Sequence, residues 1–154
     1  MYIVIDTNIW IRAMVDKEFT IECGDVINKF VANKEYILAL DIENKMEREY
    51  RDEIRDNRRF ELEWKRLSER NRLYWCSSNL PNNVEKQFDK LGFHEPEDRI
   101  FVGTALHSGK IIITDDSDYG ANGEEEYQAV FEYMRDKLDL KVYSSEKFCN
   151  QNEI

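Results

Sequence analysis

Aspartates stand at the ends of apolar runs in this sequence, at positions far apart along the chain. Asp6 closes the apolar run 2–5, and Asp116 follows the run 110–114 by two residues. Asp98 stands two residues before the mainly apolar run 100–106. A buried carboxylate at the end of a strand costs free energy unless a partner neutralises its charge. Several carboxylates at one sheet edge repel one another, and a divalent cation with oxygen ligands relieves that repulsion.

Magnesium and manganese are the expected cations, because both favour carboxylates and waters and both bridge to phosphate. His94 and His107 are isolated, and no two of Cys23, Cys76 and Cys149 have the spacing of metal ligands. A bound cation lowers the pKa of its water and orients it toward phosphorus, and a second one about 3.5–4 Å away stabilises the leaving oxygen. The acids therefore predict phosphate-ester hydrolysis without a side-chain nucleophile.

The apolar pattern predicts the elements that must position these acids. Four apolar runs have the character of strands, at 2–5, 36–40, 110–114 and 140–143. Helical spacing predicts helices at about 9–15, 22–33, 42–57, 60–71, 83–91, 97–108 and 124–138, with a terminal turn at 145–149. Residues 74–83 are expected to be a loop. Ile42, Met46, Tyr50 and Ile54 form the inward stripe of the helix at 42–57.

This alternation predicts an α/β fold: a single domain over 1–154 with three α/β/α layers and a mainly parallel central sheet. Residues 55–82 are expected to form a helical or loop insertion within it. Sites in such folds lie beyond the carboxyl ends of the strands. The acids at strand ends therefore fall where a site is expected.

Composition limits the function classes. The chain has 154 residues, 42% of them hydrophobic, with 6 glycines, 2 prolines and a net charge of −10. Disordered and collagen-like classes are excluded, and no apolar run approaches the roughly 20 residues of a membrane helix. The start of the chain lacks the basic segment of a signal peptide, and the odd number of cysteines predicts reduced thiols in a cytoplasmic protein.

The acidic balance disfavours a protein that holds nucleic acid by bulk electrostatics. Residues 45–72 are an exception, because ten basic residues there outnumber eight acidic ones. Such interleaving is typical of a solvated helix face with i,i+4 ion pairs. Arginine makes up eight of the ten cations, however, and arginine suits phosphate.

Each candidate acid also has a purely structural interpretation. Asp6 and Asp98 are suitable helix caps or first-turn residues. Asp116 and Asp118 are suitable turn residues. Glu47 and Glu49 lie on a helix so charged that glutamates are expected anywhere on it. These interpretations stay open at this point.

Four segments together resemble the motifs of PIN-domain ribonucleases, in the order of that family and across the whole chain. Residues 3–8, Ile-Val-Ile-Asp-Thr-Asn, resemble its opening motif, and residues 97–105 are similar to its third acidic motif. Residues 111–118 resemble its fourth motif, and residues 142–148 its last strand and Phe-bearing turn. The stretch 55–80 is longer than a compact toxin-type PIN domain needs.

The resemblance implies roles for particular residues. Asp6, Asp98 and Asp116 become metal ligands, with Asp118 as an auxiliary ligand. Asn8 and Thr114 do not bind the metal themselves but orient its ligands or the substrate. The family's second acid is a glutamate on the helix after the second strand, and we favour Glu49, which precedes Tyr50 on the inward stripe; Glu47 is the alternative. The implied catalytic set is Asp6, Glu49, Asp98 and Asp116.

The resemblance implies an endoribonuclease that cleaves single-stranded RNA with Mg²⁺ or Mn²⁺. One role that the resemblance suggests is the toxin half of a toxin–antitoxin pair. RNA is then the substrate, an antitoxin or another protein is a possible partner, and homodimer formation is possible, with no membrane involved. The arginines of 48–72 suggest an RNA clamp or a partner surface. A PIN-like binding module without activity is the alternative. A phosphohydrolase of the haloacid dehalogenase type fits less well, because it needs a second aspartate where Asn8 stands.

Overall fold

Five short strands form one sheet in the computed structural model, which describes residues 1–152. They are β1 (Tyr2–Ile5), β2 (Ile37–Asp41), β3 (Leu73–Cys76), β4 (Ile111–Ile113) and β5 (Lys141–Tyr143). Their order is β3-β2-β1-β4-β5, and every neighbouring pair is parallel. The predicted α/β class with a mainly parallel sheet is confirmed. The chain leaves β1 toward β2 and returns to β4 on its other side, so the carboxyl ends of β1 and β4 flank a switch point.

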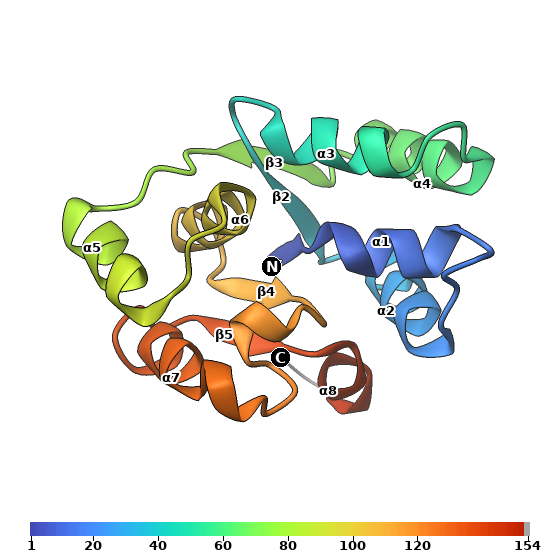
Figure 1. The fold of residues 1–154 in the computed structure, drawn as a ribbon. Coiled ribbons are helices and arrows are strands. Elements are labelled where there is room, and N and C mark those ends of the chain that lie inside the picture. Colours follow the sequence, from blue (N-terminus) through green and yellow to red (C-terminus); the bar gives the residue numbers. More distant parts are fainter. Residues whose placement is uncertain (153–154) are drawn as a thin grey trace.

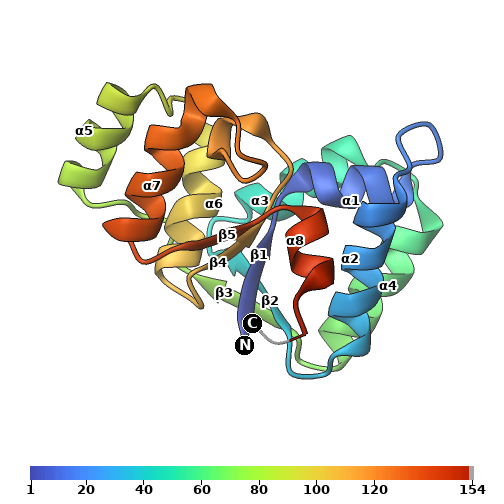
Figure 2. The ribbon, with the colours of Figure 1, turned by 90° about the horizontal axis from the view of Figure 1, so that it is seen from below.

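Helices cover both faces of this sheet (Figures 1 and 2). One face carries α1 (Thr7–Met14), α2 (Ile21–Ala32), α4 (Arg58–Glu69) and α8 (Ser145–Asn150), as Figure 2 shows. The other face carries α5 (Asn82–Leu91), α6 (Pro96–Leu106) and α7 (Gln128–Asp136). Helix α3 (Lys45–Glu53) contacts β2, α1 and α6. Two single-turn helices, η1 (Ser117–Tyr119) and η2 (Glu125–Tyr127), follow β4. The three layers match the prediction.

The core explains why a helix as charged as α3 is held in place. Only Met46 and Tyr50 of α3 are buried. The Tyr50 ring lies 5.9 Å from that of Trp10 and 6.4 Å from that of Phe60, and its hydroxyl donates to the Ile5 carbonyl. An aromatic cluster and one hydrogen bond therefore fix α3 at the carboxyl end of β1.

The predicted loop at 74–83 is wrong for residues 74–76, which belong to β3. Ala39, Leu40 and Asp41 of β2 pair with them in parallel. β3 is an edge strand, and Tyr74 and Trp75 are 38% and 43% exposed. The segment therefore lacks the continuous buried run that identifies an interior strand.

The helix predicted at 42–57 is also shorter than expected. The buried Asp41 carboxylate accepts hydrogen bonds from Lys45 N at 2.9 Å and Met46 N at 2.8 Å, so α3 begins at Lys45. Ile42 lies before this start and is 63% exposed, which removes it from the inward stripe. The helix predicted at 124–138 is divided into η2 and α7.

Residues 55–82 contribute α4, β3 and the loop between β3 and α5. Phe60, Trp64 and Leu67 of α4 are part of the core. Arg72 is buried, and its guanidinium donates to the carbonyls of Phe30, Val31, Asn33 and Tyr36. This arginine therefore holds β3 to the turn before β2 and is not available to a nucleic acid.

Two further observations concern the cysteines and the length of the helices. Cys23, Cys76 and Cys149 are free thiols. Across residues 1–152, no helix combines the length and the apolar character that crossing a bilayer requires.

Candidate metal centre

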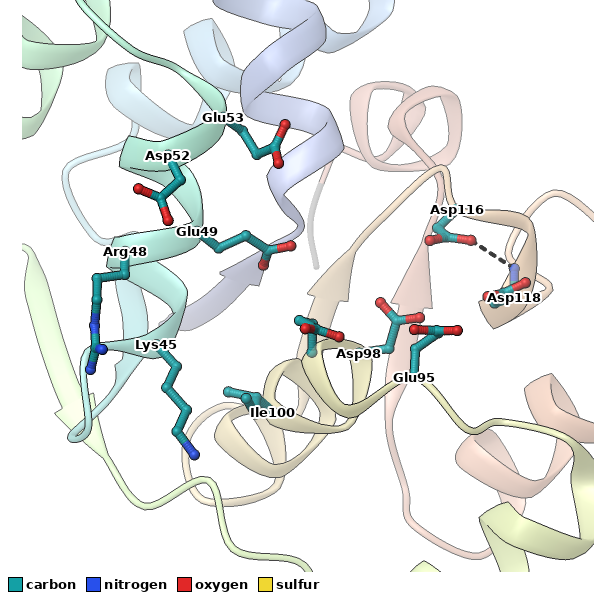
Figure 3. A pocket seen from close by; sticks show the side chains of 11 residues that line it. Lys45, Arg48, Glu49, Asp52, Glu53, Glu95, Asp98, Ile100, Asp116 and Asp118 are labelled. Atoms are coloured by element: carbon teal, nitrogen blue, oxygen red, sulfur yellow. Dashed lines mark hydrogen bonds between the residues drawn. The ribbon is translucent and has the colours of Figure 1, made fainter.

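A pocket of about 650 Å³ opens at the carboxyl edge of the sheet, where the predicted acids converge (Figure 3). Its walls come from α3, from α6 with the residue before it, and from the turn after β4. Eight carboxylates and two cations line it; its residues are Lys45, Arg48, Glu49, Asp52, Glu53, Glu95, Glu97, Asp98, Ile100, Asp116 and Asp118. The pocket is therefore strongly anionic.

Three aspartates in this pocket have the geometry of a cation site. Asp98, Asp116 and Asp118 each offer a carboxylate oxygen, and these atoms lie within 4.8 Å of one another. Asp98 comes from the first turn of α6 and is 9% exposed. Asp116 Oδ1 accepts a hydrogen bond from Asp118 N at 2.9 Å, which holds the turn after β4. Asp116 is thus a turn residue that also lines the pocket, so its structural role does not exclude a role in the site.

Asp6 lies beside this group without being one of its three members. It is 4% exposed, and its Oδ2 accepts a hydrogen bond from Thr114 Oγ1 at 2.6 Å. The same Thr114 oxygen accepts from Asp116 N at 3.0 Å. Asp6 stands before α1, but its side chain makes no capping hydrogen bond to that helix. Thr114 therefore links Asp6 to the turn that carries Asp116, as its expected orienting role requires.

Burial, and after it the repulsion between neighbouring carboxylates, raises the pKa of two acids at this site. Burial, opposed by the Thr114 hydrogen bond and reinforced by the charges of Asp116 and Glu49, raises the pKa of Asp6 from 3.8 to about 7. Burial, followed by the charges of Asp6, Asp116, Asp118 and Glu49, raises the pKa of Asp98 from 3.8 to about 8. A cation in the pocket reverses this repulsion, because it favours the charged form of each carboxylate.

The two candidate glutamates have different surroundings. Glu49 lines the pocket, and burial is the main cause that raises its pKa. Glu47 pairs with Arg51 at 3.3 Å and does not line the pocket. The structure therefore brings Glu49 to the aspartates and leaves Glu47 outside. Asn8 is half-buried in the first turn of α1 and does not line the pocket either.

Some residues near the site were not anticipated from the sequence. Glu95, Glu97, Asp52 and Glu53 add charge to the pocket walls. Tyr119 is fully buried, and its hydroxyl donates to the Asp98 carbonyl at 3.2 Å. The position of Glu97 beside Asp98 is a signal that sequence reasoning could have used, whereas nothing in the sequence marks Tyr119.

Thr7, between Asp6 and Asn8, was not singled out either. Its hydroxyl oxygen is buried and makes no hydrogen bond of ideal geometry within residues 1–152, but it lies close enough to the Glu49 carboxylate to oppose the rise in the pKa of Glu49. Its place in the Asp-Thr-Asn motif is the sequence signal that could have found it.

The donor set suits a hard divalent cation. Among residues 1–152, no lysine or arginine forms an ion pair with Asp6, Glu49, Asp98, Asp116 or Asp118. Of the two cations in the walls, Lys45 pairs with Glu43 at 2.8 Å, and Arg48 donates to the Glu43 carbonyl at 2.9 Å. The carboxylates are thus left without a protein counter-ion, and all their donor atoms are oxygens, as Mg²⁺ and Mn²⁺ prefer.

Comparison with protein-family models, with curated proteins and with solved structures gave no significant match. The fold and the acid cluster are therefore the observations from which a function is inferred.

Proposed function

We propose that this protein is a divalent-cation-dependent endoribonuclease that hydrolyses phosphodiester bonds of single-stranded RNA, with Mg²⁺ or Mn²⁺ as its cofactor. The observation that carries the proposal is the convergence of Asp98, Asp116 and Asp118 within 4.8 Å at the switch point of a parallel sheet. Phosphate esters are the substrates that a cation held by carboxylates and waters commonly activates. The choice of RNA rests on the resemblance of the motifs to those of PIN-domain ribonucleases.

Each acid has a role that follows from its position. Asp98, Asp116 and Asp118 hold the cation, with Asp6 beside them as a further ligand, and Thr114 keeps Asp6 and Asp116 in their relative places. When bound, the cation lowers the pKa of a water and neutralises the charge that develops on the phosphate. Glu49 faces the same pocket from α3 and accepts the proton that the attacking water loses. Its raised pKa brings it closer to the operating pH, which suits a general base.

The biological setting belongs to the same proposal. A cytoplasmic toxin of a toxin–antitoxin pair, with a protein antitoxin as partner, is the setting that the family resemblance favours. Homodimer formation also stays a prediction. The arginines of 48–72 support an RNA clamp less well than their number suggests, because Arg72 is buried and Arg51 and Arg66 are paired with glutamates.

The test is cleavage of a labelled single-stranded RNA in EDTA, in Mg²⁺ and in Mn²⁺. We expect cleavage with either cation and none in EDTA. Asp98→Asn and Asp116→Asn should lower the rate by at least about 100-fold, the usual contribution of a catalytic proton-transfer or ligand group. Glu49→Gln should do the same, and Glu47→Gln on the same helix is its matched control with unchanged activity.

Cleavage that persists in EDTA, or in Asp116→Asn purified in parallel, would contradict the proposal. RNA that binds to the wild-type protein with either cation present and is never cut would favour the inactive binding module instead.

A further inference from the structure

A second pocket of about 410 Å³ adjoins the acidic pocket. The two share Lys45 and Ile100 in their walls. In Figure 3 these two residues lie on the side of the acidic pocket away from Asp116 and Asp118. The volume of the second pocket is in the range of sites for small organic ligands. Lys45 and Ile100 therefore lie at the boundary between the two pockets.

The two pockets differ in charge. Eight carboxylates line the first, whereas Glu43 and Glu85 are the two acids of the second. Lys45, Arg99 and His94 also line the second pocket. A polyanion that reaches the aspartates is repelled by the other walls of the acidic pocket. The next unit of the polyanion therefore meets less repulsion in the second pocket than in the acidic one.

One wall of the second pocket is a loop that α6 holds rigidly. Ser78, Asn79 and Leu80 line the pocket from this loop. A Cβ atom on Gly103 of α6 would lie 1.9 Å from the Ser78 carbonyl oxygen, so the loop backbone lies directly on the helix. Farther along α6, at its end, His107 Nε2 is 2.9 Å from the Asn79 carbonyl oxygen. The loop is thus pre-organised at two points.

The side chains that this wall presents suit a nucleobase. Leu80, Pro96 and Ile100 provide apolar surface, and Asn79 provides an exposed amide beside it. Bases of single-stranded RNA are recognised by contact on their faces and by hydrogen bonds to their edges. Asparagine can donate and accept at one base edge at the same time.

Lys45 can meet a phosphate between the two pockets by exchanging its exposed ion pair for one with the phosphate. Arg99 is tied to the Phe93 carbonyl at 2.8 Å and to Asp89 at 2.6 Å. Lys45 pairs with Glu43, but both side chains are about half exposed, so this ion pair is weak and exchangeable.

We propose that the second pocket holds the nucleotide next to the scissile phosphate, with Lys45 contacting the phosphate between the pockets and Asn79 contacting the base edge. This inference rests on the proposed nuclease function and adds to it a binding site for one neighbouring nucleotide. Lys45 and Asn79 are then positioning residues, and the bond-breaking chemistry stays with the aspartates.

The test measures binding and cleavage separately. Binding of a fluorescein-labelled RNA octamer is followed by anisotropy in Ca²⁺, which takes oxygen ligands as Mg²⁺ does. Lys45→Ala should weaken binding about 5–10-fold and reduce the slope of log K against log salt by about 0.7, the value for one lost phosphate contact on a single strand. Lys65→Ala is the matched control, because Lys65 also pairs with a glutamate and lies on α4.

Asn79→Ala is tested on a random RNA pool by sequencing the cleaved ends in Mn²⁺. It should reduce the preference for one base beside the cut by at least about 5-fold and leave the other positions unchanged. Asn150→Ala, at the end of α8, is its control.

The outcomes separate this inference from the nuclease proposal. If Lys45→Ala binds RNA like the wild type while Asp116→Asn abolishes cleavage, the nuclease stands and the nucleotide pocket is wrong. If no cation supports cleavage but RNA binding depends on Lys45 and not on Lys65, the catalytic proposal is wrong and the pocket is a site for an RNA nucleotide without a scissile phosphate.

Discussion

A single hydroxyl group organises two of the candidate acids. Thr114 is fully buried, and its one proton is given to Asp6 Oδ2, while its oxygen accepts from the backbone of Asp116. Asp6 thereby has a fixed partner without a positive charge beside it. The stability of the folded protein therefore depends on pH through the ionisation of Asp6 and Asp98.

The first prediction concerns the pH dependence of stability without a cation. The pKa of Asp6 rises from 3.8 to about 7 and that of Asp98 to about 8. Between these values the folded protein binds more protons than the unfolded chain, so the free energy of unfolding falls as pH rises. We expect it to fall from about pH 4 to about pH 8 in EDTA. Asp98→Asn should flatten this fall and be more stable than the wild type at pH 8.5.

Denaturant titrations at several pH values measure the effect. Asp139→Asn is the control, because Asp139 has a side chain that is 87% exposed and a φ of 55° that asparagine accepts. A wild-type protein whose stability increases between pH 5 and pH 8 in EDTA would mean that folding does not raise the pKa of these two carboxylates.

At the scale of elements, β3 depends on one buried arginine. Arg72 donates four hydrogen bonds to carbonyls, and a lysine ammonium is too compact to reach all of them. Arg72→Lys should therefore lower the free energy of unfolding by about 2–4 kcal/mol, the cost of buried carbonyls left without a donor. Arg70→Lys, at an exposed position two residues away, should leave stability unchanged. Equal effects of the two changes in urea unfolding would refute the role of Arg72.

Alanine substitutions at the two glycines inside helices should have opposite effects on stability. A Cβ on Gly103 would meet the Ser78 backbone at 1.9 Å, whereas one on Gly24 would meet the Phe19 ring at 3.3 Å. Phe19 is 50% exposed, so its ring can move. We expect Gly103→Ala to destabilise by about 2–3 kcal/mol. Gly24→Ala should stabilise by about 0.5–1 kcal/mol, because alanine is the better helix former. Thermal unfolding of the two variants tests this contrast, and a stable Gly103→Ala would show that the loop does not rest on α6.

Two aspartates that close apolar strands show how far sequence reasoning reaches. Asp6 and Asp41 have the same local setting, and the alternation of elements was sufficient to predict the sheet edge where they lie. Asp6 turns toward the candidate centre, whereas Asp41 caps α3. The difference arises from which backbone amides each carboxylate meets, and that depends on how the next helix packs.

Strand β3 and the choice between two glutamates show the same limit. β3 was missed because its exposed aromatics do not form a buried run. Glu49 and Glu47 lie two residues apart, and the phase of α3 decides which one faces the pocket. Tyr50 sets that phase, so the neighbouring aromatic was the useful signal.

At the scale of the whole molecule, one sheet joins both halves of the chain. β1 pairs with β2 on one side and with β4 on the other, so the two sets of helices share a continuous core. We therefore expect a single cooperative unfolding transition. Far-ultraviolet and near-ultraviolet circular dichroism should have the same midpoint in urea. Separate midpoints would mean that residues 55–82 or another segment unfold independently.

The exposed edge strand also gives this molecule an intrinsic optical reporter. Trp10 and Trp64 are 0% and 8% exposed, whereas Trp75 on β3 is 43% exposed. A collisional quencher such as acrylamide therefore reaches one indole and is largely excluded from the other two. The fraction of the tryptophan fluorescence that acrylamide quenches therefore reports the exposure of edge strand β3, and no attached dye is needed.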